Sequence, residues 1–480
     1  MALLINKKPI ILIIFFLLGL LLSLAFDPYN LPFFSVIIVG LFFLMNDQIY
    51  KYYNWNYKFI FCTGLMFGFS FFISSIYWIS NSVLIYPDLK YLLPIPLIGL
   101  PFVLGIFYGL MQILNFFFWS KNISRVLYFP IIWTFFEILR STAFTGLPWN
   151  ILAYSWTWSL YMMQSLSIFG VYGLCLLTCL VASCLFSFKF NKKNYFISSV
   201  VIFIFLLIYF YGVNRVESYH NEYVNDEKIR LIGTNFNQED KWKNESIQKA
   251  MLLGSNEIIT IFPETSIGFT KKIPTNWLTG SVRKENDNYY NSMQFGRYFY
   301  DKQKLVPFTE LLPFEKFVKL FNVNNIIPEN FFTAGDTNQE FDKRILPSIC
   351  YEGIFPTLIL SKLTEDAEVI VNISNDAWFG KYTGPKQHLT HIQYRTIETG
   401  LPLIRSTNKG FSVLVNPIGK VIAEIPKDEL GFIDIKIPKK IEPTIYSKYG
   451  DFPFIIFIAL SIIILYILEK KYLIRENKDV

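Results

Sequence analysis

Cys350 stands apart from the other cysteines of this 480-residue chain. It lies near the end of the apolar run Leu346–Tyr351, and a helical pattern follows. A nucleophile at such a strand-to-helix turn is exposed, and the backbone N–H groups beside it can bind an oxyanion. An unpaired thiol outside an apolar segment also needs a functional reason, so we predict that Cys350 is a nucleophile. The other thiols lie inside long apolar segments, where cysteine usually acts as a small hydrophobe: Cys62, Cys175, Cys179 and Cys184.

Two charged residues also follow predicted strands. Glu264 comes after Ile261–Pro263, and Lys302 comes after Gly296–Asp301. Ligands of open α/β sheets lie beyond the carboxyl ends of the strands, so a thiol, a carboxylate and an amine could converge there. A carboxylate can act as the base for the thiol if burial raises its pKa, and a cation beside the oxyanion stabilises the tetrahedral intermediate. Each residue alone has an ordinary structural explanation, so the argument depends on their combination.

The composition indicates a membrane protein. Charged residues make up 17% of the chain and apolar residues 52%, whereas a soluble domain has about 25% charged residues. The net charge of +7 is better explained by loop lysines that set membrane orientation than by a nucleic acid partner. We predict eight spans, most of them long enough for a bilayer of about 30 Å: 9–26, 32–45, 57–80, 91–119, 126–139, 160–188, 195–212 and 453–468.

Basic residues are distributed unequally across these spans. With both termini on one side, the loops and tail of that side hold 13 lysines and arginines, and the short loops opposite hold Lys90 and Arg140. The positive-inside rule therefore predicts cytoplasmic termini and an outward-facing middle segment. We expect a membrane domain of seven spans at 1–212, a second domain at 213–452, and the eighth span with a cytoplasmic tail at 453–480.

The segment 213–452 has the pattern of an α/β or α+β domain, large enough for a full core. Short apolar runs alternate with helical patterns, for which we predict helices at 245–254, 353–363 and 385–399. The predicted strands are Lys228–Phe236, Glu257–Phe262, Gly296–Asp301, Leu346–Tyr351, Ala367–Ile373, Leu403–Ser406, Ser412–Asn416 and Gly431–Ile437.

Several motifs together resemble a known family. Pro263-Glu264, the run Tyr300–Glu310 and Cys350-Tyr351-Glu352 resemble the Glu–Lys–Cys triad of the nitrilase superfamily. The whole pattern of spans and motifs is similar to apolipoprotein N-acyltransferase. Further matching runs are Phe136–Arg140, Gly146–Trp149, Asn375–Gly380 with Trp378, Pro385–His388 and Arg405–Gly410. The resemblance implies a helical membrane domain plus a nitrilase-like αββα sandwich.

The resemblance also implies roles. Glu264 would be the general base, Cys350 would carry an acyl thioester, and Lys302 would stabilise the oxyanion together with the backbone N–H of Tyr351. The supporting residues it implies are Glu310, Tyr351, Glu352 and Trp242, with Trp242 at the acyl-chain entrance.

The implied reaction takes an acyl chain from a membrane phospholipid and passes it to the N-terminal amine of a diacylglyceryl-prolipoprotein. It places the protein in the bacterial inner membrane with a periplasmic catalytic domain. We expect a monomer that uses no cofactor and no metal.

The chain departs from the family pattern in the loops. Only 38 positions separate Glu264 from Lys302, Thr309 replaces the usual glycine, and Gly233–Gln238 matches the first-strand motif loosely. We expect these differences to affect the loops that gate the site and select the acyl chain.

Other hypotheses remain open. His388 and His391 lie three apart on a predicted helix and could face a metal or serve as a base for Cys350. Glu137 and Arg140 could pair with each other or contact a lipid headgroup or the incoming lipoprotein. The same triad would also suit a membrane-tethered amidase or nitrilase in which water takes the acyl group. A transporter or receptor is disfavoured, because the spans hold few charges and show no pair of broken helices.

Overall fold

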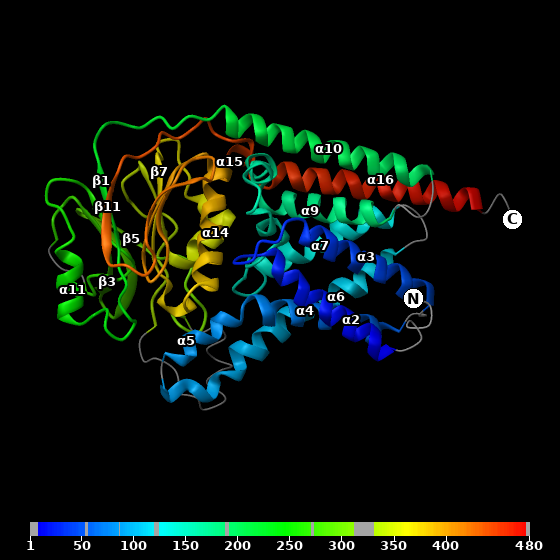
Figure 1. Ribbon diagram of the computed structural model, residues 1–480, viewed down its shortest axis with the longest axis horizontal. Helices are drawn as coiled ribbons and strands as arrows, with labels where there is room; N and C mark the ends of the chain where they lie inside the picture. The colour runs from blue at the N-terminus through cyan, green and yellow to red at the C-terminus, as the bar shows by residue number, and fades with distance from the viewer. Residues whose placement is uncertain are drawn as a thin grey trace. The chain divides into compact units, whose positions relative to one another are not determined.

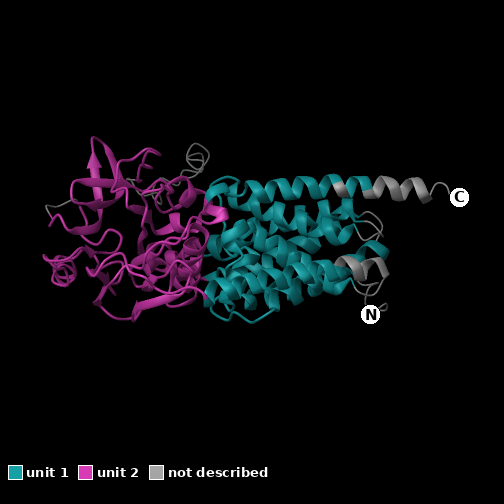
Figure 2. Cartoon of the chain, turned by 90° about the horizontal axis from the view of Figure 1, so that it is seen from above, with its two compact units in different colours: residues 1–77, 93–217, 448–480 teal, residues 78–92, 218–447 magenta. Residues whose placement is uncertain are grey.

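The chain folds into two units, each built from segments that are distant in sequence. The computed structural model describes residues 8–52, 56–85, 87–119, 124–187, 192–269, 273–311 and 331–476. The first unit comprises residues 1–77, 93–217 and 448–480, and the second comprises 78–92 and 218–447 (Figure 2). Residues 78–92 therefore belong with the second unit, although the sequence pattern predicts membrane spans at 57–80 and 91–119.

The first unit is helical, because its apolar segments satisfy their backbone polar groups internally. Among the described residues, six helical stretches are long and apolar enough to cross a membrane. These are Lys8–Ala25, Phe34–Lys51, Tyr57–Ser75, Pro87–Phe118, Leu166–Phe186 and Ser198–Glu217. The corresponding helices are α2 (Lys8–Leu22), α3 (Phe34–Tyr52), α4 (Tyr57–Ser75), α6 (Leu100–Phe118), α9 (Leu166–Phe186) and α10 (Lys192–Glu217).

Two of the eight expected spans fall outside that set. The segment 126–139 lies in α7 (Arg125–Thr142), which carries Arg125, Glu137 and Arg140. The segment 453–468 lies in α16 (Phe452–Glu476), whose apolar stretch Phe452–Ile467 is shorter than the other six. The total of eight therefore stays a prediction.

Glycines allow α4 and α6 to pack closely. A Cβ on Gly64 would lie 2.1 Å from the carbonyl oxygen of Tyr108, and one on Gly68 would lie 2.9 Å from the Cα of Gly105. Small residues of this kind bring helix backbones together where lipid offers no hydrophobic driving force between helices.

The second unit contains two mixed β-sheets. The first has six strands in the order β11-β1-β2-β3-β4-β5, and the second has five in the order β10-β9-β8-β7-β6. The first sheet comprises β1 (Ile229–Gly233), β2 (Thr260–Ile261), β3 (Trp277–Glu285), β4 (Asn288–Phe295), β5 (Tyr298–Asp301) and β11 (Gly431–Ile435). The second comprises β6 (Ile345–Ile349), β7 (Val369–Asn375), β8 (Leu403–Asn408), β9 (Ser412–Val415) and β10 (Val421–Ile425).

Side chains of the two sheets meet in one apolar core, to which β1 contributes Leu231 and β7 contributes Val371 and Ile373. Ile370, one position along β7, points the other way and packs with Leu389 of α14 (Thr383–Thr399). This alternation is expected of a strand with both faces buried. The far face of the first sheet packs on Met251 of α11 (Asn244–Met251).

Helices therefore cover the outer faces of both sheets, and α11 and α14 lie on opposite sides of the strands (Figure 1). This arrangement confirms the expected αββα sandwich.

The β3–β4 hairpin and β10 are missing from the predicted strands. Gly280 and Ser281 interrupt the apolar pattern of β3, so a hydrophobicity scan passes over it. The turn between β3 and β4 contains Asn286 with φ +53°, a backbone that asparagine tolerates well. The predicted helix at 353–363 is also shorter in the structure. The chain makes the 3₁₀ turn η6 (Cys350–Ile354) and then α13 (Pro356–Ser361), because Pro356 favours a helix start.

Candidate active site

Cys350 follows directly on β6 and opens η6, as predicted. Its φ is +49°, a left-handed backbone that is uncommon for a residue with a side chain. Such strain persists only where the surroundings hold it, and it gathers at functional turns. Here Glu352 Oε2 accepts a hydrogen bond from the Ile349 N–H at 2.7 Å, which fixes the start of the turn.

Glu264 lies after β2 with its side chain buried. Its Oε1 accepts hydrogen bonds from Asn291 Nδ2 at 2.8 Å and from Lys302 Nζ at 3.2 Å. Burial opposes the ionisation of Glu264, but the ammonium groups of Lys302 and Lys241 outweigh it and lower the pKa of the carboxyl. From the sequence we expect burial to raise the pKa of Glu264, and the structure shows the opposite shift. The reason is that two cations lie near this one carboxylate, which no sequence pattern revealed.

Lys302 follows β5 and is buried. Its Nζ lies 3.2 Å from Glu264 Oε1 and 2.8 Å from Glu310 Oε1. Burial opposes its charge, but the two carboxylates raise the pKa of Lys302 above its usual value. Lys302 is therefore a fixed cation at neutral pH, as oxyanion stabilisation requires.

Glu310 closes this network. Its Oε1 accepts from Lys302 Nζ and from Asn291 Nδ2 at 2.9 Å, and its Oε2 accepts from the Val306 N–H at 2.8 Å. The Asn291 amide thus bridges Glu264 and Glu310. Since β4 was not predicted, Asn291 was missed as well.

The thiol of Cys350 is buried, whereas the strand-to-helix turn predicted an exposed nucleophile, and the charges of Glu264 and Lys302 act on it. Burial raises the pKa of Cys350 to about 12, with Glu264 adding to the rise and Lys302 opposing it. The resting site therefore pairs a protonated thiol with an ionised carboxylate. These are the protonation states that a nucleophile and its general base need before reaction.

Glu352 connects the Cys350 turn to the Lys302 loop. Its Oε1 accepts from the Gln303 N–H at 2.7 Å and from the Tyr300 hydroxyl at 2.8 Å, while Oε2 holds Ile349. One buried carboxylate therefore fixes the chain immediately after Lys302 and immediately before Cys350. Tyr351 is also buried, and its ring packs edge-on against Phe355 with centroids 5.1 Å apart.

Trp242 and Trp378 each donate a hydrogen bond from the indole nitrogen, the first to the residue after Glu264 and the second to Asn375. Trp242 is 51% exposed, and its Nε1 donates to the carbonyl oxygen of Thr265 at 2.9 Å. Trp378 is half-buried after β7. With the Asn375 amide oxygen turned toward them, Trp378 Nε1 and Lys241 Nζ both donate to it at 3.2 Å.

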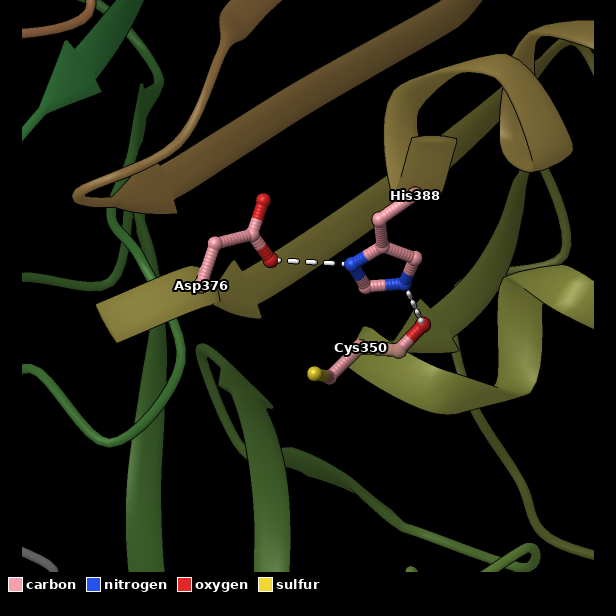
Figure 3. A group of neighbouring side chains, drawn as sticks. All are labelled: Cys350, Asp376 and His388. Atoms are coloured by element: carbon pink, nitrogen blue, oxygen red, sulfur yellow. Dashed lines mark hydrogen bonds and ion pairs between the residues drawn. The ribbon is translucent and has the colours of Figure 1, made fainter. Parts of the chain in front are cut away.

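His388 lies beside Cys350, but its ring nitrogens contact Asp376 and the Cys350 backbone oxygen, not the Cys350 sulfur (Figure 3). Nδ1 is 2.9 Å from Asp376 Oδ1, and Nε2 is 3.2 Å from the backbone oxygen of Cys350. Burial and the Arg405 guanidinium lower the pKa of His388. This geometry ties His388 to the main chain of the nucleophile. The histidine-base hypothesis stays a prediction.

Cys350, Asp376 and His388 bring possible metal ligands within 4.8 Å of one another. Arg405 lies against the same groups, with its NH2 2.9 Å from Asp376 Oδ2 and 3.1 Å from His388 Nδ1. A guanidinium already supplies positive charge there, so this set of side chains does not suit a metal ion. His391 is buried on α14.

Glu137 and Arg140 lie one turn apart on α7 in the helical unit. They form a buried ion pair, and the Tyr108 hydroxyl donates to Glu137 Oε1 at 2.6 Å. Arg140 NH1 also donates to the Leu147 carbonyl oxygen at 2.5 Å. Of the two hypotheses, pairing is what the structure contains, and contact with a headgroup or lipoprotein stays a prediction.

Family comparisons cover both units. The model described as apolipoprotein N-acyltransferase N-terminal domain matches residues 18–184, and the model described as carbon-nitrogen hydrolase matches residues 277–446. The chain is 32% identical to the apolipoprotein N-acyltransferase of Rickettsia typhi, over 95% of this chain and 98% of that one. Identity to the protein of that name from Rickettsia prowazekii is also 32%, with the same coverage. For Rhizobium leguminosarum bv. trifolii it is 33%, over 79% of this chain and 80% of that one.

An αββα sandwich with a carbon-nitrogen hydrolase match places the second unit in the nitrilase-like class of enzymes. Full-length relatives then narrow that class, since they share both units with this chain. The chain belongs to the apolipoprotein N-acyltransferase family, and it is a membrane acyltransferase.

Proposed function

We propose that the chain transfers an acyl group from a membrane phospholipid to the α-amino group of the N-terminal S-diacylglyceryl-cysteine of lipoproteins, through a thioester on Cys350. The observation that carries this proposal is the buried contact between Glu264 and Lys302, at 3.2 Å, in a site electrostatically coupled to the Cys350 thiol. A relative covered over 98% of its own length is named apolipoprotein N-acyltransferase.

In the first half-reaction Glu264 accepts the Cys350 proton, and the sulfur attacks the ester carbonyl carbon. The developing oxyanion is stabilised by Lys302 and the backbone N–H of Tyr351. When the intermediate collapses, the C–O bond breaks, Glu264 returns the proton to the alcohol oxygen, and a lysophospholipid leaves.

In the second half-reaction the amine attacks the thioester carbonyl carbon and gives a proton to Glu264. The C–S bond then breaks, the sulfur recovers that proton, and an amide is released. Dividing the transfer in this way replaces one difficult step with two easier ones.

The supporting residues have separate roles in this proposal. Glu310 holds Lys302 in place, and Glu352 fixes the backbone on both sides of the site. Trp242, half exposed and hydrogen-bonded to the Thr265 carbonyl oxygen, would line the acyl-chain entrance.

For the membrane arrangement, we place the protein in the bacterial inner membrane. Residues 1–212 supply seven spans, 213–452 form a periplasmic catalytic domain, and 453–480 add an eighth span and a cytoplasmic tail. The excess of basic residues beside the termini supports this orientation. A monomer suffices, because Glu264, Lys302 and Cys350 all belong to one unit of one chain.

Intact mass spectrometry of the full-length protein incubated with phospholipid tests the proposal. We expect a hydroxylamine-sensitive acyl adduct on Cys350, absent in Cys350→Ala and slow to form in Glu264→Ala and Lys302→Ala. A wild-type spectrum without adduct, under conditions that support lipoprotein acylation, would exclude the thioester.

A chase with a diacylglyceryl-cysteine peptide then separates the two reaction classes. Amide product supports the acyltransferase, whereas free fatty acid alone would identify the membrane-tethered hydrolase instead. The histidine hypothesis is tested alongside, because His388→Ala and His391→Ala should still form the adduct. If they do not form it while Glu264→Ala does, histidine is the base.

A further inference from the structure

Lys241 is a second buried lysine beside the candidate site, and the proposed mechanism does not use it. It lies in the turn before α11 and is 5% exposed. Its Nζ donates to Thr265 Oγ1, lies 3.5 Å from the Glu264 carbonyl oxygen, and reaches the turned Asn375 amide oxygen at 3.2 Å. All three are neutral oxygens, and among the described residues no carboxylate pairs directly with this ammonium.

The surroundings of Lys241 are part of the candidate site. With Glu264 it lines a cavity of about 10 Å³, about the space of one water molecule. The other lining residues are Thr234, Phe236, Pro263, Ser266 and Asn408. The charged and titratable groups that act on Lys241 come from three other elements. Glu264 and Cys350 favour its charge, and Lys302 opposes it.

The charges of the buried groups explain why a second lysine lies there. Glu264 and Glu310 are two carboxylates around one ammonium, that of Lys302. With Lys302 alone the buried group would carry a net negative charge, and a thiolate would have to form beside it. A second ammonium makes the group neutral. Charges interact strongly in a buried site, so this difference favours the anionic sulfur and the later oxyanion.

We propose that Lys241 is a positioning residue of the acyl-transfer site. It anchors the loop that carries Glu264, through Thr265, and balances the negative charge as that charge passes from Glu264 to the Cys350 sulfur and on to the acyl oxygen. This inference rests on the proposed function, and it assigns Lys241 no bond-making step.

The protonation of Lys241 gives the inference a distinctive signature. Burial lowers the pKa of Lys241 to about 8. The lysine is therefore charged below that pH and loses its charge as the pH rises through it. Acyl-enzyme formation should fall over the same range, whereas ionisation of the thiol alone would make it rise. Arginine stays charged at every pH used, so Lys241→Arg should remove the decline.

The experiment measures two rates on the full-length protein between about pH 6 and about pH 10, a range that brackets the titration of a buried lysine. One rate is acyl-adduct formation on Cys350 with phospholipid vesicles. The other is alkylation of Cys350 by iodoacetamide without lipid, followed at the peptide level. Lys241→Arg and Lys241→Met are compared with Lys243→Met, since Lys243 lies two residues away and is exposed, paired with Asp240.

We expect Lys241→Met to slow adduct formation at neutral pH by about tenfold, the effect of about one pKa unit at the thiol. It should also move the alkylation curve of Cys350 to higher pH. Lys241→Arg should keep the neutral rate, and Lys243→Met should match the wild type. Loss of packing alone would instead slow both reactions equally at every pH.

Wild-type rates and pH curves in Lys241→Met would overturn the inference, as would an Arg variant that behaves like the Met variant. If Lys241→Met does not fold, the wild-type and Lys241→Arg curves decide between the same outcomes. If no variant forms an adduct but the alkylation curves shift as expected, the proposed function fails while the charge role of Lys241 stands.

Discussion

Lys302 and Glu310 lie eight residues apart in the chain, and their side chains meet inside the protein with Nζ 2.8 Å from Oε1. The carboxylate of Glu264 approaches the same ammonium at 3.2 Å. Two acids therefore hold one lysine, so Lys302 has a fixed position as well as a fixed charge. An oxyanion stabiliser acts best when it is oriented before the reaction begins.

Replacing Lys302 with methionine should slow adduct formation on Cys350 by about 100-fold to 1,000-fold, the range for removing one oxyanion donor. It should also cost about 3–5 kcal/mol of stability, because two buried carboxylates lose their partner. Mass spectrometry of samples quenched at successive times measures the rate of adduct formation, and thermal unfolding measures the stability. Lys284→Met, at an exposed position on β3, is the control. A variant that acylates at the wild-type rate would remove Lys302 from the mechanism.

Asn291→Ala should move the acid limit of adduct formation to higher pH. The Asn291 amide donates to Glu264 and helps to lower the pKa of that carboxyl. A base with a lowered pKa stays ionised until the pH falls through that pKa, so removing the donor raises the pH at which the base is lost. The test is the rate of adduct formation at acid pH, with Asn288→Ala in the same strand as control. An unchanged acid limit would contradict this role.

The contrast between Glu264 and Asn291 illustrates how far the sequence could lead. Glu264, Lys302 and Cys350 each follow an apolar strand, and a strand end is a local pattern that a sequence displays. Asn291 lies within β4, a strand with little apolar periodicity, and its partners are 27 and 19 residues away. Its role depends on how β4 pairs in the sheet, which no local pattern specifies.

Glu352→Gln tests whether the distance between Cys350 and Lys302 is held by one side chain. The carboxylate accepts hydrogen bonds from the N–H groups of Ile349 and Gln303, and an amide offers one acceptor atom in place of two. We expect the protein to fold and adduct formation to slow by about tenfold or more, as a small misplacement of reacting groups would cause. Glu245→Gln, at an exposed helix position, is the control. Equal rates in both variants would show that other contacts set the geometry.

Gly280→Ala should damage the site from the neighbouring strand. A Cβ there would lie 2.3 Å from the Thr265 nitrogen and 2.6 Å from the Glu264 Cα, so the loop carrying the base must shift. We expect the free energy of unfolding to fall by about 1–3 kcal/mol, as at other overpacked positions. The rate of adduct formation should fall by a larger fraction than the free energy of unfolding does. Gly431→Ala in β11 of the same sheet is the control, because its nearest contact would be 4.0 Å away. Retained activity in Gly280→Ala would mean that the Glu264 loop tolerates displacement.

Lys241 shows why the charge balance of the site was not predicted. The sequence places it next to Trp242, which family resemblance singles out, yet a lysine in a polar loop is ordinarily solvated. Its burial follows from the turn that brings it under Glu264, and its effect is to lower a pKa that burial alone would raise. Glu264 could be proposed as the base from the sequence, but the direction of its pKa shift required the structure.

Residues 78–92 mean that the catalytic unit cannot be separated from the rest of the chain by a single cut. Trp78 Nε1 donates to Gln387 Oε1 at 3.0 Å, and its ring packs on Phe379 with centroids 4.8 Å apart. A fragment of residues 218–447 would lose these contacts and uncover the Phe379 ring. The second unit is therefore complete only when residues 78–92, synthesised about 130 residues before the rest of it, pack onto it. Its folding during synthesis then depends on the earlier insertion of the helices on either side of residues 78–92.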